Sequence, residues 1–148
     1  LKNSIPKSIL ILGLGGGTIA KILRAKYPDA AITGLEIDPI MIELGKKYLN
    51  LDKYNIDIKI QDASKFKFVN YDLVIIDTYN GDNFPKEFES SKFLEKLTKN
   101  NLVIINRLYF GDKRPDTVRF GQKLEKVFKK VTWFYPEANL MFICNNSN

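Results

Sequence analysis

The sequence Ile9-Leu10-Ile11-Leu12-Gly13-Leu14-Gly15-Gly16-Gly17-Thr18 is an apolar run that ends in a cluster of glycines. Consecutive aliphatic residues without polar alternation are typical of a strand that is buried on both faces of a parallel sheet. The glycines let the backbone turn sharply and approach a ligand without a Cβ in the way. Beyond them, Ile19, Ile22 and Leu23 follow a helical period. Strand, glycine turn and helix together predict the first unit of a nucleotide-binding α/β fold.

Strand and helix patterns alternate along the rest of the chain. Apolar runs predict further strands over residues 31–38, 56–60, 71–77 and 102–106. Two closing strands, over 131–135 and 140–144, are joined by a connection too short for a parallel crossover, so we expect them to pair antiparallel. This order predicts an α/β fold with a doubly wound sheet, and we expect residues 1–148 to form a single domain.

Each predicted helix carries an apolar stripe that we expect to face the core. Asp38-Pro39 is typical of a helix start, with Asp as the N-cap and Pro at the first helical position. The stripe of that helix comprises Ile40, Met41, Leu44 and Tyr48. A later helix contains Phe88, Leu94 and Leu97. The last helix begins at Arg114-Pro115-Asp116, and its inner residues are Val118, Leu124, Val127 and Phe128.

Composition excludes several classes of protein. No apolar run approaches the roughly 20 residues that a membrane span needs. The first residues lead almost directly into a core strand, so we expect no signal peptide. The chain contains no histidine, which excludes a histidine triad and an ordinary zinc site. The lone Cys144 excludes an internal disulfide and fits a reducing compartment. We therefore expect a cytoplasmic globular protein with no membrane association and no metal.

The net charge of +6 raises the question of a nucleic-acid partner. The excess comes mostly from lysine and is spread along amphipathic segments, as at Lys123, Lys126, Lys129 and Lys130. A solvated helix face explains such lysines better than a phosphate-binding patch. Nucleic acid is therefore disfavoured as a partner, although composition alone leaves it open.

The candidate functional residues close the predicted strands. In a doubly wound sheet the ligand lies beyond the carboxyl ends of the strands, where the strand order reverses. Glu36 follows Gly13 by 23 residues, about where a dinucleotide fold places the carboxylate that accepts hydrogen bonds from a ribose diol. Asp38 is explained by its role as a helix cap. The other strand-closing residues are Asp62-Ala63, Asp77-Thr78 and Asn106.

The glycine turn alone leaves the cofactor open. The nicotinamide dinucleotide fingerprint has glycine at the sixth position of G-x-G-x-x-G, and this chain has Thr18 there. A single glycine pattern is weak evidence in either direction, so the later motifs carry more weight.

Four motifs in register resemble class I S-adenosylmethionine-dependent transferases, in particular the spermidine synthase-like group. The glycine stretch and Leu35-Glu36-Ile37-Asp38-Pro39 resemble the first two motifs. Gln61-Asp62-Ala63 is similar to the acidic pair that contacts adenine in the family. Tyr71 to Tyr79 resembles the strand and loop that bear the reactive-centre aspartate. The resemblance implies a Rossmann-like sheet of seven strands, mostly parallel with the last strand antiparallel.

The resemblance also implies the site. The cofactor is expected to be S-adenosylmethionine or its decarboxylated form. Asp77 is the candidate catalytic residue, as the base or as the group that orients the acceptor, and Tyr79 and Asn80 lie on the substrate side. Cofactor contacts are implied for Gly13, Gly15, Gly16, Gly17, Glu36, Ile37, Asp62, Ala63, Asp77 and Thr78.

The chain departs from the spermidine synthases at one motif. Those enzymes carry D-x-x-D on the loop after the fourth strand, whereas this loop reads Asp77-Thr78-Tyr79-Asn80. The second carboxylate, which helps to hold the polyamine, is replaced by an amide without charge. Asp82 and Glu137 remain as candidate substitutes. The N-terminal β-domain that precedes the sheet in those enzymes is also missing from this sequence.

Several functions remain open at this level. The departure favours methyl transfer, or transfer to a changed acceptor, over aminopropyl transfer. A cofactor-binding module without catalysis and a nicotinamide oxidoreductase are the alternatives. We expect a small-molecule acceptor, with amines as one class, and a homodimer is left open.

Overall fold

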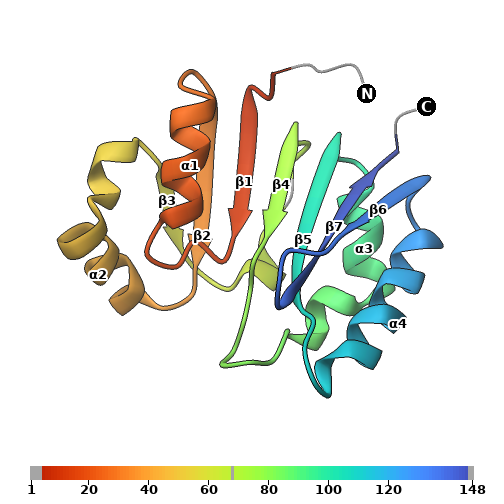
Figure 1. Cartoon of the computed structure of the whole chain (residues 1–148). Coiled ribbons are helices and arrows are strands. Elements are labelled where there is room, and N and C mark those ends of the chain that lie inside the picture. The colour runs from red at the N-terminus through yellow and green to blue at the C-terminus, as the bar shows by residue number, and fades with distance from the viewer. Residues whose placement is uncertain (1–4, 68, 147–148) are drawn as a thin grey trace.

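The computed structural model describes residues 5–67 and 69–146, which form a seven-stranded sheet flanked by helices (Figure 1). The strand order is β3-β2-β1-β4-β5-β7-β6. β1 to β5 pair in parallel, and β7 is antiparallel to both β5 and β6. This confirms the predicted fold class. The strands are Ser8–Leu12 (β1), Ala31–Glu36 (β2), Asp57–Ile60 (β3), Leu73–Ile76 (β4), Leu102–Leu108 (β5), Lys130–Phe134 (β6) and Asn139–Asn145 (β7).

Helices cover the sheet from both sides. α1 lies on one face, and α3 and α4 lie on the other (Figure 1). No helix in the described part of the chain is long and apolar enough to cross a membrane. The α-helices are Thr18–Lys26 (α1), Pro39–Leu49 (α2), Ser91–Leu97 (α3) and Lys113–Glu125 (α4). Short 3-10 helices span Leu51–Tyr54 (η1), Ala63–Lys65 (η2) and Lys86–Glu89 (η3).

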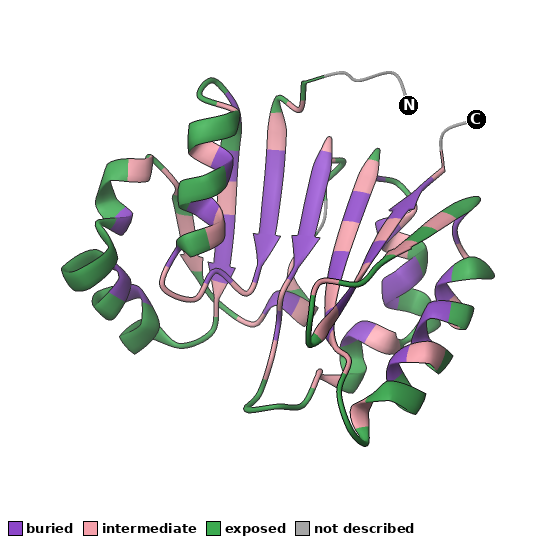
Figure 2. Cartoon of the chain, viewed as in Figure 1, coloured by how far each residue is buried: buried purple, intermediate pink, exposed green. Residues whose placement is uncertain are grey.

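The central strands are buried on both faces, which explains their unbroken apolar sequence. Ile9 and Ile11 of β1 pack in a cluster with residues of α1 and α2. Leu10 and Leu12 alternate with them and belong to the cluster that contains the buried residues of α3 and α4. Figure 2 shows β1 and β4 buried along nearly their whole length. A strand between two helical layers cannot use polar alternation.

The strand order reverses between β1 and β4. Leu12 of β1 pairs with Leu35 of β2 on one side and with Ile76 of β4 on the other. The chain leaves β1 for β2 and returns to the far side of β1 as β4, so the loops after these strands diverge. This divergence opens a crevice at the carboxyl ends, as expected at the switch point of a doubly wound sheet.

The start of α2 is as predicted, but its predicted inner stripe is wrong. The Asp38 carboxylate accepts a hydrogen bond from the N–H of Ile40 at 2.9 Å, and proline occupies the first helical position. Ile40, Leu44 and Tyr48 are 60%, 44% and 64% exposed, and Met41 is exposed as well.

Close contact between α2 and the glycine turn explains this difference. α2 turns Ile42 and Gly45 inward instead. A Cβ built on Gly45 would lie 2.7 Å from the carbonyl oxygen of Gly16, so only glycine allows the helix to come this close. The close approach fixes the rotation of the helix about its axis, and the apolar stripe faces outward.

Three other helical expectations need correction. Ile22 of α1 is exposed, and Ala20 is buried beside Leu23 instead. The predicted helix from Phe88 to Leu97 is divided into η3 and α3, because the Ser90 side chain accepts from the N–H of Phe93 and starts a new helix. α4 ends at Glu125, so Val127 and Phe128 follow the helix rather than belonging to it.

Candidate functional site

A cleft of about 1470 Å³ runs along the carboxyl ends of the parallel strands. One half, which we call the turn half, is lined by residues 13–16, 18–19, 35–38, 41, 61–64 and 77–78. The other, the loop half, is lined by residues 79–89, 107–108, 113, 116–117, 119–120 and 123. Apart from Gly17, every residue predicted to bind cofactor or substrate lines this cleft.

In the glycine turn after β1, Gly13 is tightly packed and Gly15 borders open space. Gly13 has φ +84°, and a Cβ built there would lie 2.3 Å from the main-chain oxygen of Asp77. Gly15 has φ +53°, and no described heavy atom lies within 4 Å of a Cβ built there. Gly13 therefore lets the turn pack against the end of β4, whereas Gly15 borders open space in the cleft wall.

Gly16 and Gly17 pack the turn against other parts of the fold. Gly16 lines the cleft, and a Cβ on it would meet the end of the Leu49 side chain. Gly17 is buried, is the N-cap of α1 with φ +93°, and leaves no room for a side chain beside Leu51. Gly17 is thus placed for packing, away from the cleft wall.

Glu36, at the end of β2, braces the glycine turn. Its Oε2 accepts a hydrogen bond from the N–H of Gly15 at 2.7 Å. Its Oε1 accepts from the N–H groups of Ile37 at 2.9 Å and Asp38 at 3.0 Å. A carboxylate has about four acceptor positions, so any diol that binds here shares the carboxylate with these main-chain donors.

The residues after β2 and β3 complete the turn half. Ile37 is exposed in the cleft wall, and Ala63 is buried at the start of η2. The Asp62 carboxylate accepts from the Ser64 hydroxyl at 2.7 Å and from the Ser64 N–H at 2.9 Å. These two hydrogen bonds, the hydroxyl first, hold the pKa of Asp62 below its usual range. Asp62 is therefore an anion with a fixed orientation.

Asp77 stands where the two halves meet. Its N–H donates to the carbonyl oxygen of Leu12 at 2.9 Å, which ties the end of β4 to the end of β1. Its Oδ1 accepts from Nδ2 of Asn106 on β5 at 2.9 Å. This hydrogen bond fixes one oxygen of the carboxylate.

Two buried polar atoms beside Asp77 have no partner among the described residues. They are Oγ1 of Thr78 and Oδ1 of Asn106. An unpaired buried polar atom costs about 1–3 kcal/mol, and a ligand that hydrogen-bonds such an atom removes this cost. Thr78 lines the cleft, so its hydroxyl is suited to a ligand contact.

Tyr79 and Asn80 follow Asp77 and Thr78 in the loop after β4. The Tyr79 hydroxyl donates to the main-chain oxygen of Asn106 at 3.0 Å, and burial raises the pKa of Tyr79 to about 12. Tyr79 is therefore a neutral hydrogen-bond donor at physiological pH. Asn80 and Asn83 exchange main-chain hydrogen bonds of 2.9 and 3.1 Å, which fold the loop into a tight turn at the cleft.

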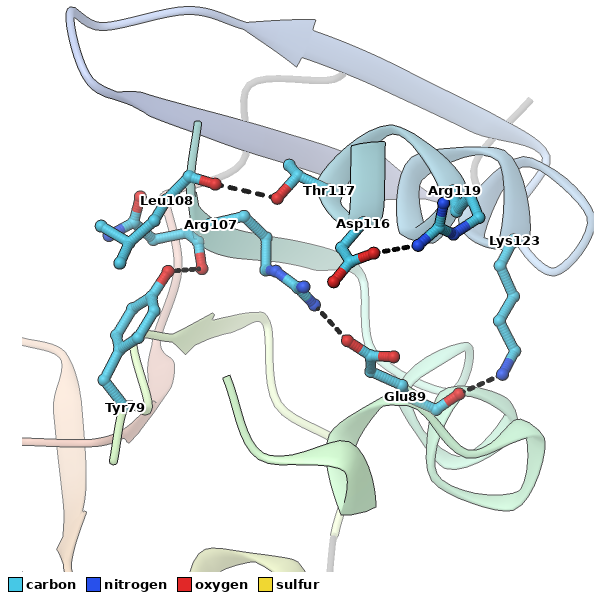
Figure 3. Close-up of polar contacts among 9 residues, drawn as sticks. Tyr79, Glu89, Arg107, Leu108, Asp116, Thr117, Arg119 and Lys123 are labelled. Carbon is cyan, nitrogen blue, oxygen red and sulfur yellow. Dashed lines mark hydrogen bonds and ion pairs between the residues drawn. The ribbon is translucent and has the colours of Figure 1, made fainter. Parts of the chain in front are cut away.

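The two halves of the cleft differ in charge. The turn half presents Glu36, Asp38, Asp62 and Asp77, with no lysine or arginine among its lining residues. Asp62 forms an ion pair with Lys65 at 3.6 Å, but Lys65 lies outside the cleft lining. In the loop half, three of the four lining carboxylates are paired with basic side chains. The pairs are Glu89–Arg107 at 2.7 Å and Asp116–Arg119, both drawn in Figure 3, and Asp82–Lys113 at 2.9 Å. Within residues 5–67 and 69–146, no three His, Cys, Asp or Glu side chains group as a metal site.

Sequence reasoning named Asn106 as a strand end but missed Arg107, Glu89 and Lys113. Arg107 does carry a signal, because Val103, Ile105 and Arg107 alternate along β5 and so share a buried face. A charge at the third such position indicates a buried ion pair. Its partner lies 18 residues away in the chain, in η3, and no periodicity links the two.

The family follows from a match that spans all four predicted motifs. A family model described as a methyltransferase domain matches residues 9–98, from the first strand to the end of α3. This chain belongs to the methyltransferase domain family. The match confirms the resemblance to class I S-adenosylmethionine-dependent transferases drawn from the four motifs.

Curated relatives of this domain are named for two kinds of transfer. A polyamine aminopropyltransferase of Vibrio vulnificus is 28% identical over 117 residues, which is 72% of this chain and 39% of that protein. A protein of Drosophila melanogaster named eEF1A lysine and N-terminal methyltransferase homolog is 33% identical over 110 residues. That match covers 65% of this chain and 16% of the relative. The chain thus spans less than half the length of either relative.

A solved structure confirms the fold. Human methyltransferase-like protein 13, crystallised in complex with SAH, superposes with a TM-score of 0.81 at 21% identity. The superposition covers 97% of this chain and 73% of that one. The seven-stranded arrangement of the domain is therefore shared with a structure that holds a ligand of this cofactor class.

The contrast between Gly13 and Gly15 predicts different costs for the same substitution. Gly13→Ala should destabilise the fold by roughly 2–4 kcal/mol, because strain at positive φ adds to a clash with the Asp77 carbonyl. Gly15→Ala should cost only about 1–2 kcal/mol, because strain acts without a clash. Urea unfolding of both variants measures this difference. Equal losses of unfolding free energy would contradict the geometry of the turn.

Proposed function

We propose that this domain is an S-adenosylmethionine-dependent transferase that moves a methyl group to an amine. The observation that carries the proposal is the place of Asp77, where the glycine turn and the loop half meet. Membership of the methyltransferase domain family supports the cofactor class. The relatives named as polyamine and lysine transferases support a nitrogen acceptor.

The charge of the turn half fits the cofactor. S-adenosylmethionine carries a positive sulfonium, whose adjacent methyl carbon is electrophilic. The turn half presents carboxylates without a basic lining residue, and this arrangement favours a cation by Coulomb attraction. The pyrophosphate of a nicotinamide dinucleotide would meet repulsion in the same place, which weighs against an oxidoreductase.

The residues of the turn half suggest specific contacts. Glu36 is suited to the ribose diol, because a carboxylate accepts two hydroxyl hydrogen bonds without donating any. Ile37 and Ala63 offer apolar surface for the adenine ring, and Asp62 offers an acceptor for its amino group. The open space beside Gly15 gives the ligand room next to the main chain.

Asp77 is suited to handle the proton of the acceptor. An amine must lose a proton to attack an electrophilic carbon, and a carboxylate within hydrogen-bond reach can accept it. Asn106 holds Oδ1 of Asp77, so the orientation of the carboxylate is set before the acceptor binds. Tyr79 stays protonated and cannot serve as this base. Alignment of the nucleophile with the methyl carbon supplies the rest of the rate enhancement.

The charges of the loop half disfavour a polyamine acceptor. Asn80 contributes no charge, and Asp82 is held by Lys113, whose side-chain hydrogen bond lowers the pKa of this carboxyl. Glu137 does not line the cleft. Neither carboxylate left open by the sequence is therefore placed to replace the missing one. This supports methyl transfer over aminopropyl transfer.

Cofactor binding can be tested at Gly15. Gly15→Leu should abolish binding of S-adenosylhomocysteine, because the side chain would extend into the open space of the turn half. Gly111→Leu is the matched control, since Gly111 also has positive φ (+48°) and open surroundings but lies outside the cleft. Isothermal titration calorimetry compares the two variants. Unchanged affinity in Gly15→Leu would place the cofactor elsewhere.

The role of Asp77 predicts a loss of turnover without a loss of cofactor. Asp77→Asn should lower the rate of labelled methyl transfer to a panel of primary amines by about 10²-fold or more, the usual contribution of a general base. The dissociation constant of S-adenosylhomocysteine should change much less than the transfer rate, because this ligand lacks the positive sulfonium that a carboxylate attracts. If the unmutated domain binds this ligand and transfers nothing, it is a binding module without catalysis.

The choice between the two transfers has its own assay. With decarboxylated S-adenosylmethionine and putrescine, we expect a kcat/KM well below about 10⁴ M⁻¹s⁻¹, the lower end of the ordinary enzyme range. The missing carboxylate leaves one ammonium of putrescine unpaired in the cleft. Efficient aminopropyl transfer would show that another acidic group holds the polyamine, and methyl transfer would no longer be the preferred assignment.

A further inference from the structure

We propose that Arg107 determines acceptor specificity by binding an anionic group of the acceptor, so that the domain acts on amines that also carry a carboxylate. The inference rests on the proposed transfer and concerns the loop half of the same cleft. It names a substrate class that is chemically opposite to a polyamine.

Arg107 lies next to Asn106 in sequence and lines the same cleft as Asp77. It follows Asn106, whose side chain holds Asp77, and it lines the loop half of the cleft. Its side chain is 7% exposed. The guanidinium carbon lies 4.2 Å from the ring centre of Phe84 and 4.6 Å from that of Phe120. The two rings fix the guanidinium by cation–π contact.

The Arg107 guanidinium has more N–H donors than its hydrogen bond to Glu89 occupies. A guanidinium is always charged and has five N–H donors in a planar fork. Glu89 accepts from Nη1 alone, at 2.7 Å, and no other hydrogen bond of the Arg107 side chain occurs among the described residues. A carboxylate that binds the fork in the bidentate manner uses two donors. The pair with Glu89 therefore leaves donors for a second anion.

Glu89 is placed to share the guanidinium. Its side chain is 34% exposed, so it reaches solvent at the cleft while Arg107 is buried behind it. Lys123 donates to the main-chain oxygen of Glu89, which fixes the backbone of η3 and leaves the carboxylate to Arg107 (Figure 3). With the carboxylates of Asp82 and Asp116 also in ion pairs, the loop half offers an acceptor one buried cation and mostly neutralised anions.

If the Arg107–Glu89 ion pair is purely structural, substitutions of the two residues should have similar effects. If Arg107 binds the acceptor, they should have opposite effects on the affinity for an anionic amine. If the pair only anchors η3 to β5, losing either partner weakens the domain in the same way. If Arg107 binds the acceptor, removing Arg107 removes the attraction for an anion. Removing the Glu89 charge removes a competitor and increases that attraction.

The test uses three amines with the same four-carbon chain. γ-Aminobutyrate ends in a carboxylate, n-butylamine in a methyl group and putrescine in a second ammonium. Binding of each amine to the domain saturated with S-adenosylhomocysteine is measured by calorimetry. We expect γ-aminobutyrate to bind about tenfold more tightly than n-butylamine, the strength of one charge-assisted hydrogen bond. Putrescine should bind more weakly than either.

The variants separate specificity from stability. Arg107→Gln should abolish the preference for γ-aminobutyrate, whereas Glu89→Gln should enlarge it, since the amide still accepts from Nη1 but carries no charge. Arg114→Gln is the matched control, because Arg114 is exposed, lies 5.5 Å from the ring centre of Tyr109 and does not line the cleft. It should leave all three affinities unchanged. Thermal unfolding of each variant checks that it is folded.

The outcomes distinguish this inference from the proposed function. Failure to bind S-adenosylhomocysteine would overturn the proposed function itself. Binding of that ligand with equal affinities for the three amines, or with no binding of any of them, would overturn the role of Arg107 alone. So would parallel changes in Arg107→Gln and Glu89→Gln. If Arg107→Gln does not fold, the ranking in the unmutated domain and in Glu89→Gln decides.

Discussion

The main-chain contact between Gly13 and Asp77 is the constraint on which the site depends. Because a Cβ on Gly13 would lie 2.3 Å from the Asp77 oxygen, the ends of β1 and β4 can meet only when this position has no side chain. The hydrogen bond from the Asp77 N–H to Leu12 closes the same contact. The place where the strand order reverses is thereby brought against Asp77, and the turn half and the loop half of the cleft meet at this residue.

Different interactions stabilise the two halves of the cleft. In the turn half, the Glu36 carboxylate accepts hydrogen bonds from main-chain N–H groups of the glycine turn and of the loop after β2. Backbone atoms therefore determine the shape of this part of the cleft wall. In the loop half, one ion pair joins η3 to β5 (Glu89–Arg107) and another joins the loop after β4 to α4 (Asp82–Lys113). Lys113 also donates to Oδ1 of Asn83, which ties the turn of the loop to the first residue of α4.

The sequence predicted most of the fold and the turn half because both depend on local patterns. The unbroken aliphatic strand before Gly13 and the cap at Asp38 each carry their signal within a few residues. The rotation of α2 could not be read in this way, since it depends on the distant contact between Gly45 and Gly16. The partner of Arg107 was hidden for the same reason. The rotation of α2 and the pairing of Arg107 depend on contacts between elements that are distant in sequence, so the pattern within one element does not predict them.

The division between backbone and side chains has a consequence for how such a domain changes during evolution. Substitutions among the residues that line the loop half alter the charge and shape of that half without moving the atoms that shape the turn half. A few exchanges, for instance at Asn80 or Arg107, can thus change what the loop half binds while the turn half is kept. Relatives that share this domain and transfer different groups to different amines are the expected products of that history.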